Sequence, residues 1–302
     1  MSVAELESRQ IALEAPSGLW SEAWQRLRRN PGAIVGFILV ALFVLVAVFA
    51  PLIAPYDPRD GELSRLAGRC CPGPSGEFPF GIDQQGRDEL SRVIFGARFS
   101  LLIGVVSVAV GLSIGLLLGS VAGYLGGWID TVIMRLMDIM LSIPGLLMAI
   151  GIVALLGPGL FQIMIAIGVV NVPIFARLLR GSILAQREND FVLAARAIGV
   201  PRRQILAAHI LPNAVSPVIV QGTLALATAI IDAAGLGFLG LGPQDPSTPE
   251  WGTMLTDTVR YLQTAPHLAI IPGVAIVVSV LGFNLIGDGL REALDPKLRG
   301  RG

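Results

Sequence analysis

Lysine is almost absent from this chain of 302 residues. Its one lysine, Lys297, follows Pro296, so the chain has no Gly-Lys-Ser/Thr sequence and lacks the lysine of a phosphate-binding P-loop. Charged residues are also scarce, at 15% of the chain, where soluble domains carry about 25%. The formal net charge of zero excludes the strongly basic balance that is typical of nucleic-acid-binding proteins.

Cysteine and histidine are equally rare. Cys70 and Cys71 stand side by side in a Pro/Gly-rich stretch, either as two small loop residues or as a vicinal disulfide in an oxidising compartment. His209 and His267 have no second histidine or cysteine at ligand spacing. We therefore expect no metal site and no cofactor bound by this chain.

Long apolar runs dominate what is present, with 53% hydrophobic residues and a mean hydropathy of +0.71. A helix needs about 20 apolar residues to cross the hydrocarbon core of a bilayer. Six runs approach or exceed that length: Ala33–Ala54, Phe99–Tyr124, Ile133–Leu156, Leu160–Ala176, Val215–Gly235 and Leu268–Leu290. The expected fold class is an all-α polytopic membrane protein with six transmembrane helices.

Arginine clusters predict the orientation of these spans. Arg26, Arg28 and Arg29 adjoin the first run, which places the N-terminus in the cytoplasm by the positive-inside rule. Six crossings return the basic C-terminal residues to the same side, and they make the arginine-rich loop from 180 to 212 cytoplasmic. We therefore expect a multi-pass membrane protein with both termini in the cytoplasm.

A glycine stripe marks the second run. Gly111, Gly115, Gly119 and Gly123 recur every four residues, so they share one helix face and let another backbone approach closely. The same stretch formally matches the G-x-S-x-G motif of serine hydrolases. That motif requires a strand-to-helix turn, so its position within an apolar helix argues against an intramembrane hydrolase.

The loop between the fourth and fifth runs has its own local pattern. Asp190 is the expected N-cap of a helix over 191–198, and Gly199 is the expected left-handed residue that closes it. A second helix is expected over 201–211, with Pro201 in its first turn and Pro212 ending it. Small residues, among them Ala194 and Ala195, leave a flat face that could contact another protein.

At these residues the chain resembles a known family. Ala194-Ala195, then Gly199 and Leu211-Pro212, match the "EAA" signature of ABC importer permeases, in which this loop docks on a cytoplasmic ATPase. Leu193 departs from the signature, since the family often has glutamate there. Further stretches resemble the second, C-type permease of dipeptide/oligopeptide/nickel-type systems: residues 81–88, 91–92, 96–98, 248–252 and 287–296.

The resemblance implies a type I ABC importer permease fold, a place in a bacterial cytoplasmic (inner) membrane, and a set of partners. These are a second permease subunit, two cytoplasmic ATPase subunits or one fused ATPase, an extracytoplasmic solute-binding protein and membrane lipid, with no nucleic acid. ATP and Mg would be bound by the partner subunits. The implied substrates are dipeptides or oligopeptides, and related importers for glutathione, nickel or haem-like molecules are alternatives.

The resemblance also divides the chain. It implies a cytoplasmic segment (1–31), a first transmembrane helix (32–54), an extracytoplasmic loop (55–97), a five-helix ABC transmembrane type-1 domain (98–290) with a coupling loop (181–213), and a cytoplasmic tail (291–302). The coupling residues would be Asp190, Ala194, Ala195, Gly199, Leu211 and Pro212. The candidate pathway residues are Asn171, Gln221 and Asn284, for which hydrogen bonds between packed helices are the alternative role.

Charges near the predicted spans leave a second function open. Arg135 and Asp138 are three residues apart and can pair with each other, while Asp232 and Asp288 lie near helix ends. A proton-coupled secondary transporter could use one of these aspartates. Such a carrier predicts inverted repeats between the halves of the chain, and we find no convincing repeat.

Overall fold

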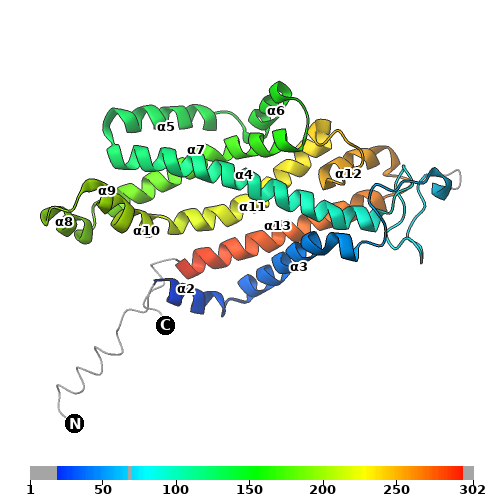
Figure 1. Cartoon of the computed structure of the whole chain (residues 1–302), viewed down its shortest axis with the longest axis horizontal. Helices are drawn as coiled ribbons and strands as arrows, with labels where there is room; N and C mark the ends of the chain where they lie inside the picture. Colours follow the sequence, from blue (N-terminus) through cyan, green and yellow to red (C-terminus); the bar gives the residue numbers. More distant parts are fainter. Residues whose placement is uncertain (1–18, 67–69, 295–302) are drawn as a thin grey trace, which may run out of the picture.

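The computed structural model describes residues 19–66 and 70–294, and these form a bundle of long helices (Figure 1). No strand occurs among the described residues, which contain one isolated bridge between Ile82 and Asp88. The helices, in chain order, are α2 (Leu19–Leu27), α3 (Pro31–Ile53), α4 (Glu89–Leu125), α5 (Gly127–Leu141), α6 (Gly145–Leu156), α7 (Leu160–Arg187), α8 (Asp190–Ala197), α9 (Arg202–Gln204), α10 (Leu211–Ala214), α11 (Ser216–Leu236), α12 (Trp251–Thr258) and α13 (His267–Leu294). Short 3₁₀ turns occupy Leu63–Leu66 and Val259–Tyr261, and π-helical turns occupy Ile205–Ile210 and Gly237–Leu241.

The ends of the long helices follow from local sequence signals. Asn30 caps α3, because its side chain accepts a hydrogen bond from the Ala33 N–H at 3.0 Å, and Pro31 occupies the first turn. Asp88 caps α4 by accepting from the Ser91 N–H at 2.8 Å. Gly126, with φ of 67°, ends α4 in a conformation that favours glycine.

Five helices are long and apolar enough to cross a membrane: α3, α4, α7, the α11 helix with its π-helical extension, and α13. The α5–α6 pair makes a sixth if it counts as one span, although it is bent by 91°. The candidate span over 133–156 is therefore not one continuous helix. The break falls at Ser142–Pro144, since proline lacks the N–H that would continue the helix and restricts the residue before it.

Two other expected boundaries also differ. The fourth run was expected to end at Ala176, but α7 continues to Arg187. The second run was expected to begin at Phe99, but α4 begins ten residues earlier at Glu89, where Asp88 supplies the cap. In both helices the extension carries charged residues that a search for apolar runs leaves out.

Figure 1 shows how the bundle is arranged along its length. The turns from α8 to α10 lie at one end, here called the coupling end, together with α2 and the last turn of α13. The loop after α3 and helix α12 lie at the other end, here called the loop end. Both described ends of the chain therefore lie at the coupling end.

Two apolar cores hold the helices together. The larger lies between α4, α6, α7 and α11 and includes Phe175, Leu179 and Ile183 of α7, each at most 1% exposed. The smaller joins α3, α12 and α13 through Phe43, whose ring centroid lies 5.7 Å from that of Trp251 and 6.1 Å from that of Phe283. Many other large apolar side chains face outward, as expected of helices that contact lipid or partner subunits.

Candidate functional site: the coupling segment and the loop end

The coupling segment, defined here as residues 188–214, connects α7 to α11 at the coupling end. Its first helix, α8, is closed by Gly199, whose φ of 79° lies in the left-handed region. The Val200 N–H donates to the Ala195 carbonyl at 3.0 Å, and the Gly199 N–H donates to the Arg196 carbonyl at 3.1 Å. This arrangement satisfies carbonyls at the end of α8 and turns the chain sharply into α9.

Three local expectations for this segment are corrected. The N-cap of α8 is Asn189, and Asp190 is its first helical residue, with no side-chain capping bond at this terminus. Pro201 is the cap residue that precedes α9, one position outside the helix. Leu211 and Pro212 begin α10 and do not end the helix before it, since proline fits the first turn of a helix as well as it ends one.

Helix α8 has a buried side and an exposed side. Val192, at 0% exposure, and Ala195, at 6%, pack into the larger core with Leu179 and Ile183 of α7. Ala194 lies on the exposed side. Phe191, Leu193, Ala197 and the following Ile198 are also exposed. One side of the segment is therefore packed into the bundle, and its other side is an apolar surface that no described residue covers.

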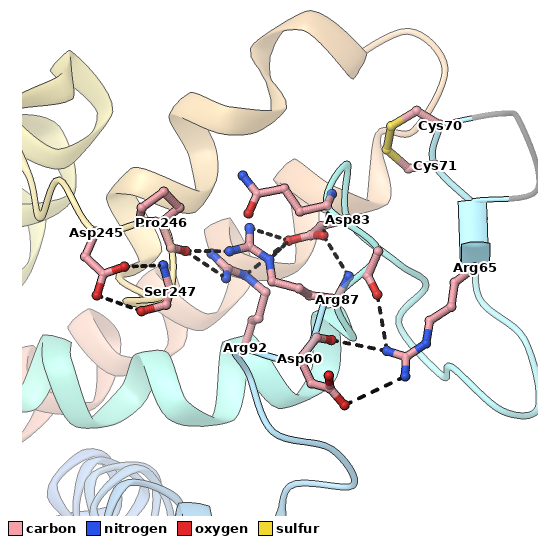
Figure 2. Close-up of polar contacts among 12 residues, drawn as sticks. Asp60, Arg65, Cys70, Cys71, Asp83, Arg87, Arg92, Asp245, Pro246 and Ser247 are labelled. Atoms are coloured by element: carbon pink, nitrogen blue, oxygen red, sulfur yellow. Dashed lines mark hydrogen bonds and ion pairs between the residues drawn. A yellow bond between two sulfur atoms is a disulfide. The ribbon is translucent and has the colours of Figure 1, made fainter. Parts of the chain in front are cut away.

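A charged cluster organises the loop end (Figure 2). Asp83 is 3% exposed and accepts hydrogen bonds from the backbone N–H groups of Gln85 at 2.8 Å and Arg87 at 2.9 Å. Its second oxygen accepts from the Arg87 side chain at 2.6 Å and lies 3.4 Å from Nε of Arg92. Both arginines also donate to the carbonyl of Pro246. The cluster thus fastens the loop before α4 to the loop before α12.

Helix α12 carries two carboxyl groups with raised pKa values, the buried Glu250 that caps it and the half-buried Asp257 near its end. Glu250 is 1% exposed and caps α12 by accepting from the N–H groups of Gly252 at 2.9 Å and Thr253 at 2.8 Å. Burial raises the pKa of Glu250, and these hydrogen bonds oppose the rise. Burial likewise raises the pKa of Asp257, against the opposing charges of Arg92 and Arg87.

Cys70 and Cys71 lie in the same loop region and are joined by a disulfide (Figure 2). Cys71 packs with Ala265 and Leu268 at the start of α13. Of the two readings that the sequence left open, the structure has the vicinal disulfide.

The expected pairing of Arg135 with Asp138 is wrong. Asp138 pairs with Arg177 of α7, and Asp130 of α5 pairs with Arg180, whose Nη2 lies 2.6 Å from the carboxylate. Arg135 is exposed on α5. The sequence spacing permitted an intrahelical pair, but α7 supplies two arginines that tie α5 to it instead.

The glycine stripe of α4 lies against α7. A Cβ atom on Gly111 would come within 2.7 Å of the Gly168 carbonyl, and one on Gly119 within 2.5 Å of the Ala176 carbonyl. A Cβ on Gly115 would lie 2.6 Å from that of Phe175, and one on Gly123 would lie 3.1 Å from that of Ile183. The stripe therefore lets the two backbones approach closely.

The three candidate pathway residues differ in their surroundings. Asn171 is 5% exposed and lies beside Gly111 of α4, and its amide donates to the Ile167 carbonyl of its own helix, α7, at 2.9 Å. Gln221 lines an open hollow of about 470 Å³ together with Arg291. Asn284 is half-buried on α13. Neither Asn171 nor Asn284 lines the hollow that contains Gln221.

Comparisons with known proteins show which family the chain belongs to. Residues 115–300 match the family described as the inner membrane component of binding-protein-dependent transport systems. The chain is 49% identical over 281 residues to the dipeptide transport system permease protein DppC of Alkalihalophilus pseudofirmus, covering 93% of this chain and 90% of the relative. It is 47% identical over 290 residues to the di/tripeptide transport system permease protein DppC of Pseudomonas aeruginosa, covering 95% of each.

A glutathione permease is about as similar. The chain is 48% identical over 282 residues to the glutathione transport system permease protein GsiD of Shigella flexneri, covering 93% of this chain and 91% of that relative. Among solved structures, an inward-facing conformation of the MetNI methionine ABC transporter matches with a TM-score of 0.56 and 21% identity, over 68% of this chain and 96% of that one. This last likeness is one of fold alone.

The chain belongs to the family of inner membrane components of binding-protein-dependent transport systems and is a permease subunit, not an enzyme. Within that family it has the features of the C-type peptide permeases, because residues 18–67 match the N-terminal transmembrane domain of oligopeptide transport permease C. The predictions of fold class and family are confirmed.

Proposed function

We propose that this chain is the C-type permease subunit of an ATP-driven importer of short peptides. With a second permease subunit it forms the membrane pathway for dipeptides or oligopeptides that an extracytoplasmic binding protein delivers. Two cytoplasmic ATPase subunits, or one fused ATPase, bind ATP and Mg and drive the cycle. The names of the similar permeases, which refer to dipeptides, di/tripeptides and glutathione, support short peptides as the substrate class.

The observation that best supports coupling to an ATPase is that helix α8 has one exposed apolar side and one buried side. Its exposed apolar side offers a contact for an ATPase, and its buried side packs on α7 and the turn at Ile205–Ile210. Ile205 and Ile210 are at most 2% exposed, and this turn leads through α10 into α11. Since closely packed interiors transmit displacement, a movement of α8 would shift α7 and α11 together.

Replacement of Gly199 tests whether this segment couples ATP hydrolysis to transport. A Cβ atom there would meet nothing within 4 Å, so the effect of Gly199→Val is limited to the strain of its positive φ. That strain is roughly 1 kcal/mol for alanine and larger for a β-branched residue. We expect peptide uptake to fall and substrate-stimulated ATPase activity to separate from transport, while the amount of protein in the membrane stays normal.

Gly181→Val is the matched control. Gly181 also has nothing within 4 Å of an added Cβ, but it lies inside α7 with no positive φ. We expect coupled uptake in this variant. Full, normally coupled uptake by Gly199→Val would show that the segment only caps the bundle.

The energy source separates this function from a proton-coupled carrier. In proteoliposomes that hold the assembled complex and ATP, a protonophore should leave peptide uptake unchanged, and removal of ATP should abolish it. Uptake that persists without ATP and collapses with the protonophore would favour the carrier and one of its candidate aspartates.

A further inference from the structure

A basic hollow of about 480 Å³ opens at the coupling end, between the end of α4 and the coupling segment. Arg187, Arg196 and Arg202 line it, with Tyr124 and Leu125 from the last turn of α4. Its apolar floor includes Ile205, which is buried. The three arginines come from the end of α7, from α8 and from α9, so the hollow exists only because the coupling segment folds back beside α4.

These three arginines have no carboxylate partner within the described parts of the chain. Arg187 donates to the Gly123 carbonyl at 3.0 Å and the Tyr124 carbonyl at 3.4 Å, so it also caps α4. Arg177 and Arg180, about two to three turns earlier on α7, are each paired with an aspartate of α5. Glu188 and Asp190 lie close in sequence but are exposed and form none of the described ion pairs. The hollow therefore gathers uncompensated positive charge.

The depth of the hollow follows from the register of α4 and α7. Gly119 lies against Ala176, and Gly123 lies against Arg180 and Ile183. The run Phe99–Tyr124 carries no charge, whereas the first charges of α7 after its apolar part are Arg177 and Arg180. At 1.5 Å per residue, the hollow begins within about two turns of this charged level. On its other side the hollow is lined by Tyr124 and Leu125, at the end of the uncharged run of α4, so it adjoins the edge of an apolar span.

An exposed apolar side chain borders the arginines of the hollow. Leu125 lines the hollow and is 59% exposed. Three residues later in the chain, at the start of α5, Trp128 is 76% exposed. Tryptophan is enriched at the membrane interface, where its ring lies at headgroup level. A ligand in the hollow can thus place an anionic group against the arginines and hydrocarbon against Leu125.

We propose that this hollow binds the phosphate-bearing headgroup of an anionic phospholipid. Guanidinium groups match phosphate oxygens in charge and geometry, and basic pockets between transmembrane helices bind anionic headgroups. The bound lipid bridges the end of α4 to α8 and α9, and so holds the coupling segment at a fixed distance from the bundle. Anionic lipid should then raise the fraction of ATP hydrolysis that leads to transport.

The test is a titration of the intact transporter complex with phosphatidylglycerol and, separately, with phosphatidylcholine. Native mass spectrometry measures how much of each lipid is bound. The test variant is Arg196→Gln with Arg202→Gln, which leaves Arg187 to cap α4. The matched control is Arg203→Gln, since Arg203 is an exposed neighbour that does not line the hollow. We expect the double variant to bind phosphatidylglycerol on the order of tenfold more weakly, with phosphatidylcholine binding unchanged, because each basic side chain near an anionic surface contributes to attraction.

Three results would overturn the proposal. The first is equal phosphatidylglycerol binding by the wild type and the double variant. The second is displacement of the lipid by inorganic phosphate, which would make a free anion the ligand. The third is loss of the ATPase subunits from the double variant with lipid binding intact, which would mean that an acidic side chain of the partner fills the hollow. Coupled transport measured in vesicles of phosphatidylcholine, with and without phosphatidylglycerol, should rise with the anionic lipid in the Arg203→Gln control and not in the double variant.

Discussion

At the scale of single residues, Asp83 is notable because its carboxylate contacts four donor groups. Its two oxygens receive two backbone N–H groups and the side chains of Arg87 and Arg92, all within a part of the loop end that excludes water. Arg87 is 2% exposed and Arg92 is 1% exposed. Removing this carboxylate would leave two buried cations without their counter-charge, and the loss of one partner from a buried ion pair is strongly destabilising.

Asp83→Asn should therefore lower the stability of the protein markedly, by about 3–5 kcal/mol. The matched control is Asp60→Asn, whose carboxylate lies 3.9 Å from Arg65 and is 67% exposed. An exposed pair contributes roughly 0–1 kcal/mol, so the control should change little. Thermal unfolding in detergent, followed by tryptophan fluorescence, checks both. Similar melting temperatures for the two variants would mean that the buried cluster tolerates the loss, for example by admitting water.

At the scale of helices, the contact between α4 and α7 shows what a sequence does and does not reveal. The period of four in the glycine stripe predicts that another backbone comes close, because the spacing alone defines one helix face. The identity of that backbone depends on packing between helices, which no single run encodes. The same limit explains the corrected cap of α8, since Asn189 and Asp190 are both good N-cap residues and the surrounding fold selects the first.

Gly119→Ala should separate α4 from α7 and destabilise the bundle. The added methyl group would lie 2.5 Å from the Ala176 carbonyl and 3.1 Å from its Cα, and backbone atoms cannot move aside as a side chain can. Overpacking of this kind costs typically about 1–3 kcal/mol. Gly151→Ala on α6 is the control, because nothing lies within 4 Å of a Cβ there. The melting temperature and the amount of folded protein in the membrane should fall for Gly119→Ala and not for the control. If neither quantity falls for Gly119→Ala, the two helices pack less closely than these distances indicate.

At the scale of the whole molecule, five of the six apolar runs correspond to helices of membrane length, and the sixth is the bent pair α5–α6. The runs did not predict how the chain folds between them. The loop-end cluster joins residues about 160 positions apart, as in the bond from Arg87 to Pro246, separated by 159 positions. Such a contact leaves no local pattern in the sequence. The bend in α5–α6 was likewise hidden, because Pro144 lies in an otherwise continuous apolar run, and a proline can kink a helix without turning it through 91°.

The topology of the chain can be tested with single cysteines introduced at Gln204 and Ser21, at the coupling end, and at Gln244, at the loop end. All three positions are exposed, and Cys70 and Cys71 are already joined in a disulfide. We expect a membrane-impermeant maleimide to label Gln244→Cys in intact cells. Gln204→Cys and Ser21→Cys should react only after permeabilisation, because the arginine clusters at the coupling end favour the cytoplasmic side.

Each alternative topology gives its own labelling pattern. The reverse pattern at all three sites would invert the protein in the membrane and remove α8 from the reach of a cytoplasmic ATPase. Labelling of Ser21→Cys and Gln204→Cys from opposite sides would mean that α5 and α6 enter and leave on one face, which gives five crossings. The structure argues against that outcome, since α2 packs on the end of α13 through Ala23, Leu27 and Ala293, at the same end of the bundle as the coupling segment. Equal accessibility of Ser21 and Gln204 is therefore the expected result, and it would make the bent pair a single span.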